Sequence, residues 1–375
     1  MWATKGLNTA LADNQRLYDI ATRQQVYIEG VKVQYAREFN FVLAELRIEL
    51  NRLLNRVKYK TLDGLTKAEL NRLVLSLRES QSRIYSKYTQ QLIKQLKDFM
   101  AADLEMNRRA YSFAHAEMNL AEGEKPPKIP TDAQAIAYIK QQNESSNIIP
   151  LFGIAAVTGN NDRLWSAVTN APIPANGLYI LPFIKTFTTS AQAGVENTIR
   201  KAWANGWTLQ ETIAELTGEE AKQGTSSQLQ RVGVQAGAVT ATALQHVSAV
   251  VGAGAISALF GWYIWLSVMD SKTSEICTSR NRKRYRFGQG PIPPAHIRCR
   301  SHISPIVGND DIAAETFYTW AVRQPANVQD DILGEANGES LRNGSLKEKD
   351  LSKYEATRPL TLEEFRRKII EVISR

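Results

Sequence analysis

Cysteine is scarce in this sequence of 375 residues, which contains only Cys277 and Cys299. Two cysteines are too few for the disulfide framework of a small secreted domain, although one disulfide, two free thiols or two metal ligands all remain open. The first residues also lack the apolar core of a signal peptide, so we expect synthesis in a reducing cytoplasm. Internal repeats and low-complexity tracts are absent as well.

The composition is that of a globular protein with an excess of positive charge. Apolar residues make up 43% of the chain and charged residues 22%, which is enough apolar material for a sizeable core. The formal net charge of +8 favours contact with nucleic acid or another acidic surface, and it says nothing about the fold. Many proteins of this size carry such a charge without a polyanionic partner. The length suggests two or three domains.

Residues 1–122 are expected to form two or three long amphipathic helices. Apolar residues recur at three- and four-residue steps on both sides of a break at Asp63-Gly64, which places them on one face of each helix. After the break, Thr66 and Glu69 have the spacing of a capping box, which marks the start of a helix. The two stripes consist of Val42, Leu46, Leu50, Leu53 and Val57, and of Leu70, Leu73, Leu77, Ile84, Tyr88, Leu92, Leu96 and Phe99.

The rest of the chain divides into three further segments. Residues 123–187 are rich in proline and glycine and are expected to form a linker and an irregular segment. Residues 188–309 are expected to form an α+β domain, with a helix from Ser190 to Ala204, and residues 310–375 a helical extension. Two more capping-box spacings mark helix starts, at Thr208 with Glu211 and at Thr361 with Glu364.

A long stretch without charge lies between Arg231 and Asp270. Residues 247–266 alone are long enough to span a membrane. Three glycines and several polar residues make this stretch a poor lipid-facing surface, so we expect a buried helix followed by a strand and no membrane span. The aromatic and β-branched residues from Gly261 to Val268 favour the strand. The sequence therefore predicts a predominantly helical α+β fold. Its long N-terminal helices precede a C-terminal domain with a helix bundle and a small antiparallel β-hairpin sheet.

Most of the residues with distinctive chemistry lie between Asp270 and Ser301. Cys277, His296 and Cys299 are candidate ligands of a tetrahedral zinc ion, with Asp270 or water as the fourth ligand. The same residues also permit a cysteine nucleophile beside a histidine, or a purely structural cluster in a small hairpin core. In the structural interpretation, Asp270 caps the turn after its strand and pairs with Arg300.

The same segment carries a basic run that is interleaved with aromatic residues. On a hairpin tip, such a run is either a solvated loop or a surface that holds phosphates and stacks on bases. The candidate nucleic-acid-binding residues are Arg280, Arg282, Lys283, Arg284 and Arg286.

These residues also carry a family likeness. The order Asp-Ser-Lys-Thr, then Cys, then Pro-Pro-x-His-x-x-Cys-Arg-Ser resembles the signature of the phage Mu protein F-like head morphogenesis family. The matching positions are Asp270, Thr273, Cys277, His296, Cys299, Arg300 and Ser301. A second segment, from Thr319 to Gly334, resembles the family's Trp-Leu-x-x-Gln-Pro…Gln…Leu-Gly, and a third, Pro359-Leu360-Thr361-Leu362, its closing motif. Some relatives have a fuller set of cysteines, and Ser301 stands where they have the last one.

The resemblance implies a minor head protein of a tailed phage, a virion component near the portal vertex or in the head interior. It implies portal or capsid proteins as partners, contact with packaged double-stranded DNA, several copies per particle, and a role in head assembly and DNA packaging or delivery. A catalytic role is not expected. Two other functions remain open: a genome-delivered enzyme with a Cys–His or metal site, and a membrane-active ejection protein.

Overall fold

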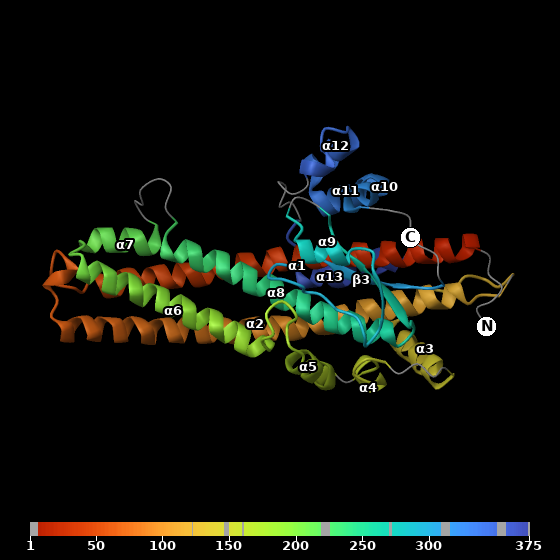
Figure 1. Ribbon diagram of the computed structural model, residues 1–375, viewed down its shortest axis with the longest axis horizontal. Helices are drawn as coiled ribbons and strands as arrows, with labels where there is room; N and C mark the ends of the chain where they lie inside the picture. Colours follow the sequence, from red (N-terminus) through yellow and green to blue (C-terminus); the bar gives the residue numbers. More distant parts are fainter. Residues whose placement is uncertain are drawn as a thin grey trace. The chain divides into compact units, whose positions relative to one another are not determined.

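The computed structural model describes residues 7–121, 123–145, 150–159, 161–218, 226–269, 272–308, 316–350 and 358–373. The fold is predominantly helical with a small three-stranded antiparallel sheet, as the sequence predicts (Figure 1). The chain forms two compact units, and each unit combines segments that are far apart in the sequence. Unit 1 comprises residues 1–34, 96–179 and 241–375, and unit 2 comprises residues 35–95 and 180–240. The division of the chain into the four expected domains remains a prediction.

Three long helices contribute residues to both units. They are α1 (Leu7–Leu54), α2 (Lys67–Met118) and α8 (Gln228–Ser257). The expected stripe on α2 is buried almost throughout, and in α1 the stripe residues Leu46, Leu50 and Leu53 are buried. The two apolar stripes therefore form helix interiors, as their spacing predicts.

Unit 2 is built only from helices in its described residues. Besides parts of the three long helices it contains η1 (Leu62–Gly64), α6 (Ile180–Ala204) and α7 (Leu209–Thr217). Its core is aromatic: the Phe39 ring meets Tyr88 edge-on at 4.8 Å between centroids and Phe187 at 5.9 Å. Edge-to-face contacts at these distances are a favourable arrangement of aromatic rings.

Capping residues set several helix starts, and one predicted start is wrong. The capping boxes at Thr66, Thr208 and Thr361 all form. The helix expected from Ser190 begins instead at Ile180, ten residues earlier. Pro182 belongs to the proline-rich segment expected to be irregular, but it lies in the first turn of this helix, where the missing backbone N–H would have no partner within the helix.

Unit 1 contains most of the short helices. The segment expected to be irregular holds α3 (Asp132–Ser145), α4 (Ile154–Val157) and α5 (Asn161–Asn170). The C-terminal segment holds α10 (Phe317–Arg323), α11 (Ala326–Leu333), α12 (Glu335–Arg342), η2 (Glu348–Asp350), α13 (Leu362–Arg367) and α14 (Ile369–Ile373). The first group corrects the expectation for residues 132–170, where proline and glycine separate short helices instead of preventing them.

The sheet of unit 1 follows α8, as the sequence predicts. Its strands are β1 (Trp262–Leu266), β2 (Arg284–Arg286) and β3 (His302–Ile306), in the order β2-β1-β3, with both pairs antiparallel. Before the sheet, α8 is long and apolar enough to cross a membrane, but 94% of its most apolar window is buried inside the protein. The core helix of a globular protein has the same composition, which agrees with the expected buried helix.

Segments that follow the sheet in the sequence pack against the first part of α1. Trp320 is fully buried, and its Nε1 donates to Asp19 Oδ1 at 3.0 Å. Arg23 donates to Gln324 Oε1 at 2.8 Å. The backbone of Leu360 donates to the carbonyl oxygen of Gly30 at 3.0 Å. The N-terminal helix is therefore part of the core that the C-terminal half of the chain builds.

Candidate metal centre and the adjoining polar cavity

Cys277, His296 and Cys299 lie together, as their spacing predicts. Cys277 is on α9 (Glu275–Arg280), and the other two residues are in the loop between β2 and β3. One ligand atom from each residue lies within 4.8 Å of the others, and the two Sγ atoms are 3.7 Å apart. Both cysteines are buried and His296 is partly exposed. Three donors therefore converge next to the surface.

Local structure fixes each donor. The Ser274 side chain caps α9 by accepting a hydrogen bond from the backbone N–H of Cys277, which places that residue in the first turn. The backbone N–H of Cys299 donates to the carbonyl oxygen of His296 at 3.1 Å, so these two residues share a tight turn. Both cysteines pack with Trp265 of β1 in one buried cluster. The donors thus join α9 and the loop to the central strand.

The two thiols form one hydrogen bond. This bond lowers the pKa of the Cys299 thiol, and backbone N–H groups of Ala295 and Ser301 act in the same direction. The same hydrogen bond, together with burial, raises the pKa of the Cys277 thiol. A thiolate that accepts backbone N–H groups is the form in which cysteine binds a metal.

The geometry of the donors fits zinc. Two sulfur ligands about 2.3 Å from a tetrahedral ion lie about 3.8 Å from each other, close to the distance between these Sγ atoms. His296 Nδ1 donates to the carbonyl oxygen of Ile297 at 2.8 Å, which leaves the lone pair of Nε2 for a ligand. A backbone partner on the other ring nitrogen is typical of metal-bound histidine.

The remaining motif residues surround the cluster without adding a zinc donor. Ser301 is buried, and its hydroxyl lies 3.1 Å from that of Ser267, which in turn donates to the carbonyl oxygen of Cys277. Thr273 and Arg300 are partly exposed. Asp270 lies outside the described residues, so its expected roles as fourth ligand, cap and partner of Arg300 stay predictions. Within the described ranges the site has three protein ligands.

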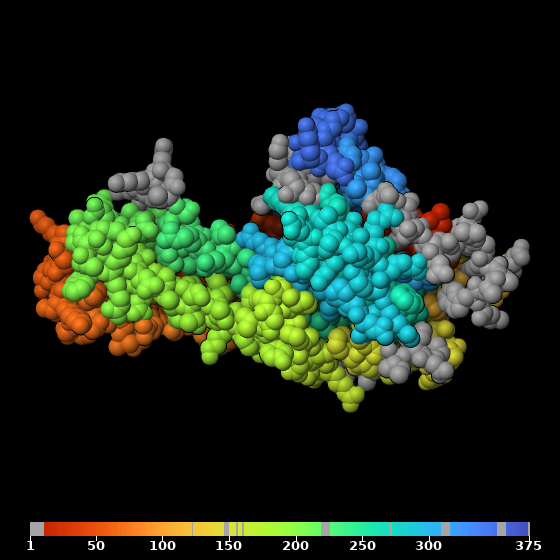
Figure 2. Space-filling view, viewed as in Figure 1, coloured from red at the N-terminus to blue at the C-terminus, as the bar shows by residue number. Residues whose placement is uncertain are grey.

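The basic run is divided between three elements and does not form one hairpin tip. The guanidinium group of Arg280, at the end of α9, lies over the Trp265 ring at 5.1 Å. Arg284 donates to the carbonyl oxygen of Gly308 at 2.5 Å. Lys283 and Arg286 are exposed, and Arg282 is partly exposed in the turn before β2. Figure 2 shows this segment (cyan) on the surface, so its exposed cations are accessible.

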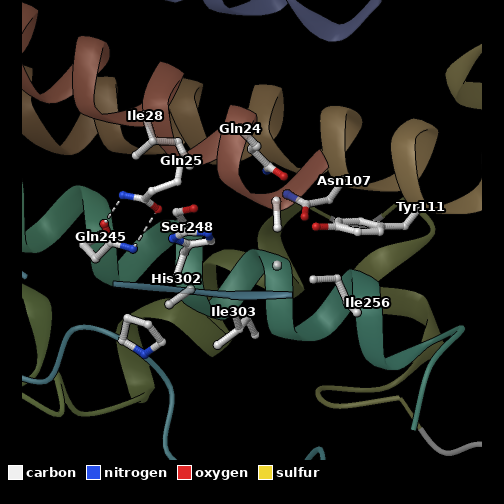
Figure 3. Close-up of a pocket in the computed structure, with 14 residues that line it drawn as sticks. Gln24, Gln25, Ile28, Asn107, Tyr111, Gln245, Ser248, Ile256, His302 and Ile303 are labelled. Carbon is white, nitrogen blue, oxygen red and sulfur yellow. Dashed lines mark hydrogen bonds between the residues drawn. The ribbon is translucent and has the colours of Figure 1, made fainter. Parts of the chain in front are cut away.

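A cavity inside unit 1 is lined by apolar side chains and by several amide groups (Figure 3). Gln25 of α1 and Gln245 of α8 face each other across it and form a hydrogen bond of 3.0 Å. Gln245 also donates to the carbonyl oxygen of Ser301 at 3.1 Å and accepts from Lys32. Lys32 lies 3.5 Å from the carbonyl oxygen of Cys299. The backbone beside the cysteine ligand is therefore held by side chains from both helices.

The cavity is large enough for water and has amide groups on its wall. Its water-accessible volume is about 30 Å³, which has room for about two molecules. Amide side chains of Gln24, Gln25, Asn107 and Gln245 line it. Beside it, Gln24 donates to the fully buried Asp103 at 2.7 Å, and burial raises the pKa of that carboxyl to about 7.

Sequence reasoning missed this cavity. The signal was the presence of Gln245 and His246 inside an otherwise apolar helix, together with Gln24 and Gln25 on α1. No periodicity within one helix indicates that Gln25 and Gln245, which are 220 residues apart, are partners.

No protein-family model, curated protein or solved structure matches the chain. The assignment of a function therefore depends on the residues and their geometry.

Proposed function

We propose that the chain is a minor head protein of a tailed phage, of the Mu protein F-like class, located in the head interior or at the portal vertex. The observation that carries this proposal is that all three segments with the family likeness belong to unit 1. Trp320 and Gln324 of the second segment and Leu360 of the third contact α1, and the first segment surrounds β1. The shared residues are thus the ones that hold this unit together.

A structural zinc ion is part of the proposal. Cys277, His296 and Cys299 would hold the ion, which ties α9 and the loop before β3 to the central strand. Structural zinc sites stabilise small elements whose own apolar core is limited. The sheet of this protein is such an element, because β2 has only three residues.

The zinc site can be tested by elemental analysis of the purified chain. We expect one zinc per chain, loss of the metal in Cys277→Ser and Cys299→Ser, and a lower melting temperature after chelation. Thr278→Ser is the matched control, because it changes an exposed neighbour on α9 and leaves the donors intact. A purified chain without metal, whose melting temperature does not respond to added zinc, would exclude the ion.

DNA contact is the second part of the proposal. The exposed Lys283 and Arg286 provide cations for backbone phosphates. Charge reversal at Lys283 and Arg286 should weaken binding to duplex DNA and reduce its salt dependence. Unchanged binding would remove this surface from the proposal.

The virion assignment has its own test. Mass spectrometry of purified particles should detect the chain at several copies per particle, and a capsid reconstruction should place it beside portal or capsid subunits. Its absence from mature particles would contradict a virion role and leave a transient role in assembly.

The Cys–His enzyme has weaker support. Cys299 carries a lowered thiol pKa beside His296, but it is fully buried, so a substrate cannot reach its sulfur without rearrangement. Phage carrying Cys277→Ser or Cys299→Ser separates the two functions. Failure of particle assembly supports the structural role, whereas normal particles that fail after DNA entry support the enzyme.

A further inference from the structure

Hydrogen bonds join two loops of unit 2 at one end of its helices. The loops are residues 55–66, between α1 and α2, and residues 205–208, between α6 and α7 (Figure 1). Leu62 N donates to Trp207 O (2.9 Å) between the two loops. The helix ends beside the second loop add two bonds to the first, from Leu209 N to Lys60 O (3.3 Å) and from Trp203 Nε1 to Leu65 O (2.9 Å). The side chains of Leu62 and Leu65 pack with Ala202 in a small apolar core beneath the loops. The loops therefore hold a fixed position within this unit.

This end presents unpaired positive charge. Arg56, Lys58, Lys60 and Lys67 are all exposed, and none of them has an ion-pair partner in the part of the chain that the structure describes. Four neighbouring cations repel one another, and such a surface gains free energy when a polyanion covers it. Figure 2 shows both loops on the surface, in orange and green.

Three carboxylates lie near these cations and keep their charge, but none of them pairs with one of the four. Glu69 and Glu211 cap helix starts, and Asp63 lies against Gly206. Glu69 accepts hydrogen bonds from the backbone and hydroxyl of Thr66, both at 2.8 Å. Glu211 accepts the corresponding bonds from Thr208 at 2.8 and 2.9 Å. The capping hydrogen bonds lower the pKa of the Glu69 carboxyl, so it stays ionised in this role.

An aromatic ring lies among the cations. Tyr59 stands between Lys58 and Lys60 in the sequence and is 41% exposed. One face is packed against Gly64, where an added Cβ atom would lie 2.9 Å from the ring. A ring that is held on one side and open on the other is a surface on which a base can stack.

We propose that Arg56, Lys58, Lys60, Lys67 and Tyr59, here called the basic platform, bind nucleic acid. The four cations would hold backbone phosphates, and Tyr59 would stack on an unpaired base. The aromatic ring favours nucleic acid over an acidic protein as the ligand. The cations alone would be sufficient to bind an acidic protein surface, whereas a base can also stack on the ring. The proposal goes beyond the minor head function and does not depend on the cysteine cluster or on the basic run of unit 1.

The test is fluorescence anisotropy of the full chain with a labelled 20-nucleotide single strand and a 20-base-pair duplex, from 50 to 200 mM salt. Charge reversal at Arg56, Lys58 and Lys60 should weaken binding to both by tenfold or more at 50 mM. For the single strand, the slope of log K against log salt should fall by about 2, because each lost phosphate contact contributes about 0.7. Tyr59→Ala should weaken single-strand binding about tenfold and leave duplex binding nearly unchanged.

The matched control reverses three exposed cations elsewhere in unit 2: Arg37, Lys87 and Lys185. At about 1.5 Å per helical residue, they lie on the order of 25–30 Å along their helices from the platform. Equal losses in the control and the platform variant would overturn the proposal, since they would reflect net charge alone. So would unchanged binding after Arg56→Gln, Lys58→Gln and Lys60→Gln, three neutral substitutions that introduce no new repulsion. Circular dichroism of each variant establishes that it is folded.

Discussion

The two units have different interiors although three helices serve both. In unit 2 the buried side chains are mostly apolar and aromatic, the few buried polar ones are uncharged, and no Asp, Glu, Lys or Arg is buried among its described residues. In unit 1 the same helices bury charged groups, namely Arg23, Lys32, Asp103 and Arg108. The contrast teaches that one long amphipathic helix can build two kinds of core. An apolar stripe is enough for the first kind, whereas the second needs specific polar partners from distant segments.

The largest expected loss of stability tests the apolar interior of unit 2. Phe39→Ala should lower the free energy of unfolding by about 4 kcal/mol, because it removes a buried ring from the aromatic cluster and leaves a cavity. Urea unfolding followed by circular dichroism measures the loss. Phe41→Ala, two residues away with its side chain 79% exposed, is the control and should change stability by less than about 0.5 kcal/mol. Similar losses in both variants would contradict the assigned helix face.

The next effect tests whether the polar interior of unit 1 is stabilising. Gln245→Leu removes three buried hydrogen bonds, those to Gln25, Lys32 and the Ser301 carbonyl oxygen, so we expect a loss of about 3 kcal/mol. Leu244→Met, at the adjacent buried apolar position, should cost less than about 1.5 kcal/mol. A smaller loss of unfolding free energy for Gln245→Leu than for Leu244→Met would contradict a stabilising role of the polar interior of unit 1.

The third prediction concerns pH and separates the units, because all four histidines lie in unit 1. Burial lowers the pKa of His115 to about 4, so the folded state excludes a proton that the unfolded chain binds below about pH 6.5. The contribution of His115 to the free energy of unfolding is therefore fully present above pH 6.5 and is lost as the pH falls toward 4.

Between pH 7.5 and pH 5, His115 should account for a loss of about 2 kcal/mol. Urea unfolding at both pH values should show this loss in the wild type and show it reduced by that amount in His115→Gln. Identical pH dependence in the two proteins would contradict a buried neutral imidazole at this position.

The smallest effect should be equal in both units. Thr208→Ala in unit 2 and Thr361→Ala in unit 1 each remove a capping box, and each should cost about 1 kcal/mol. Thr→Ser at either position keeps the hydroxyl and should retain most of the stability. Melting temperatures of the four variants provide the measurement, and a cost confined to one unit would show that the two starts are not equivalent.

Local signals explain which parts of the fold were predictable. The capping boxes and the strand at Trp262–Leu266 were correct because a few adjacent residues determine them. The convergence of Cys277, His296 and Cys299 also followed from local spacing. The predicted start of α6 is wrong because the prolines of residues 123–187 made an irregular segment the expectation, although Pro182 is compatible with a first helical turn.

Long-range pairs explain what could not be predicted. The polar cavity depends on Gln25 meeting Gln245, and neither glutamine differs locally from one that is exposed on a helix. The division of the basic run likewise depends on a tertiary contact, that of Arg280 with Trp265. Helix α9 between β1 and β2 was not expected, because Ser274 as its cap has no capping-box partner three residues later.

The contact between Gly30 and Leu360 bears on how the chain folds during its synthesis. All residues of unit 2 have been synthesised once Thr240 has left the ribosome. The hydrogen bonds that Asp19 and Gly30 of α1 form with Trp320 and Leu360 can form only after those later residues have been synthesised. We therefore expect the middle of the polypeptide to mature first, and a nascent chain stalled before Thr316 to protect unit 2 from protease while its leading segment is still cleaved.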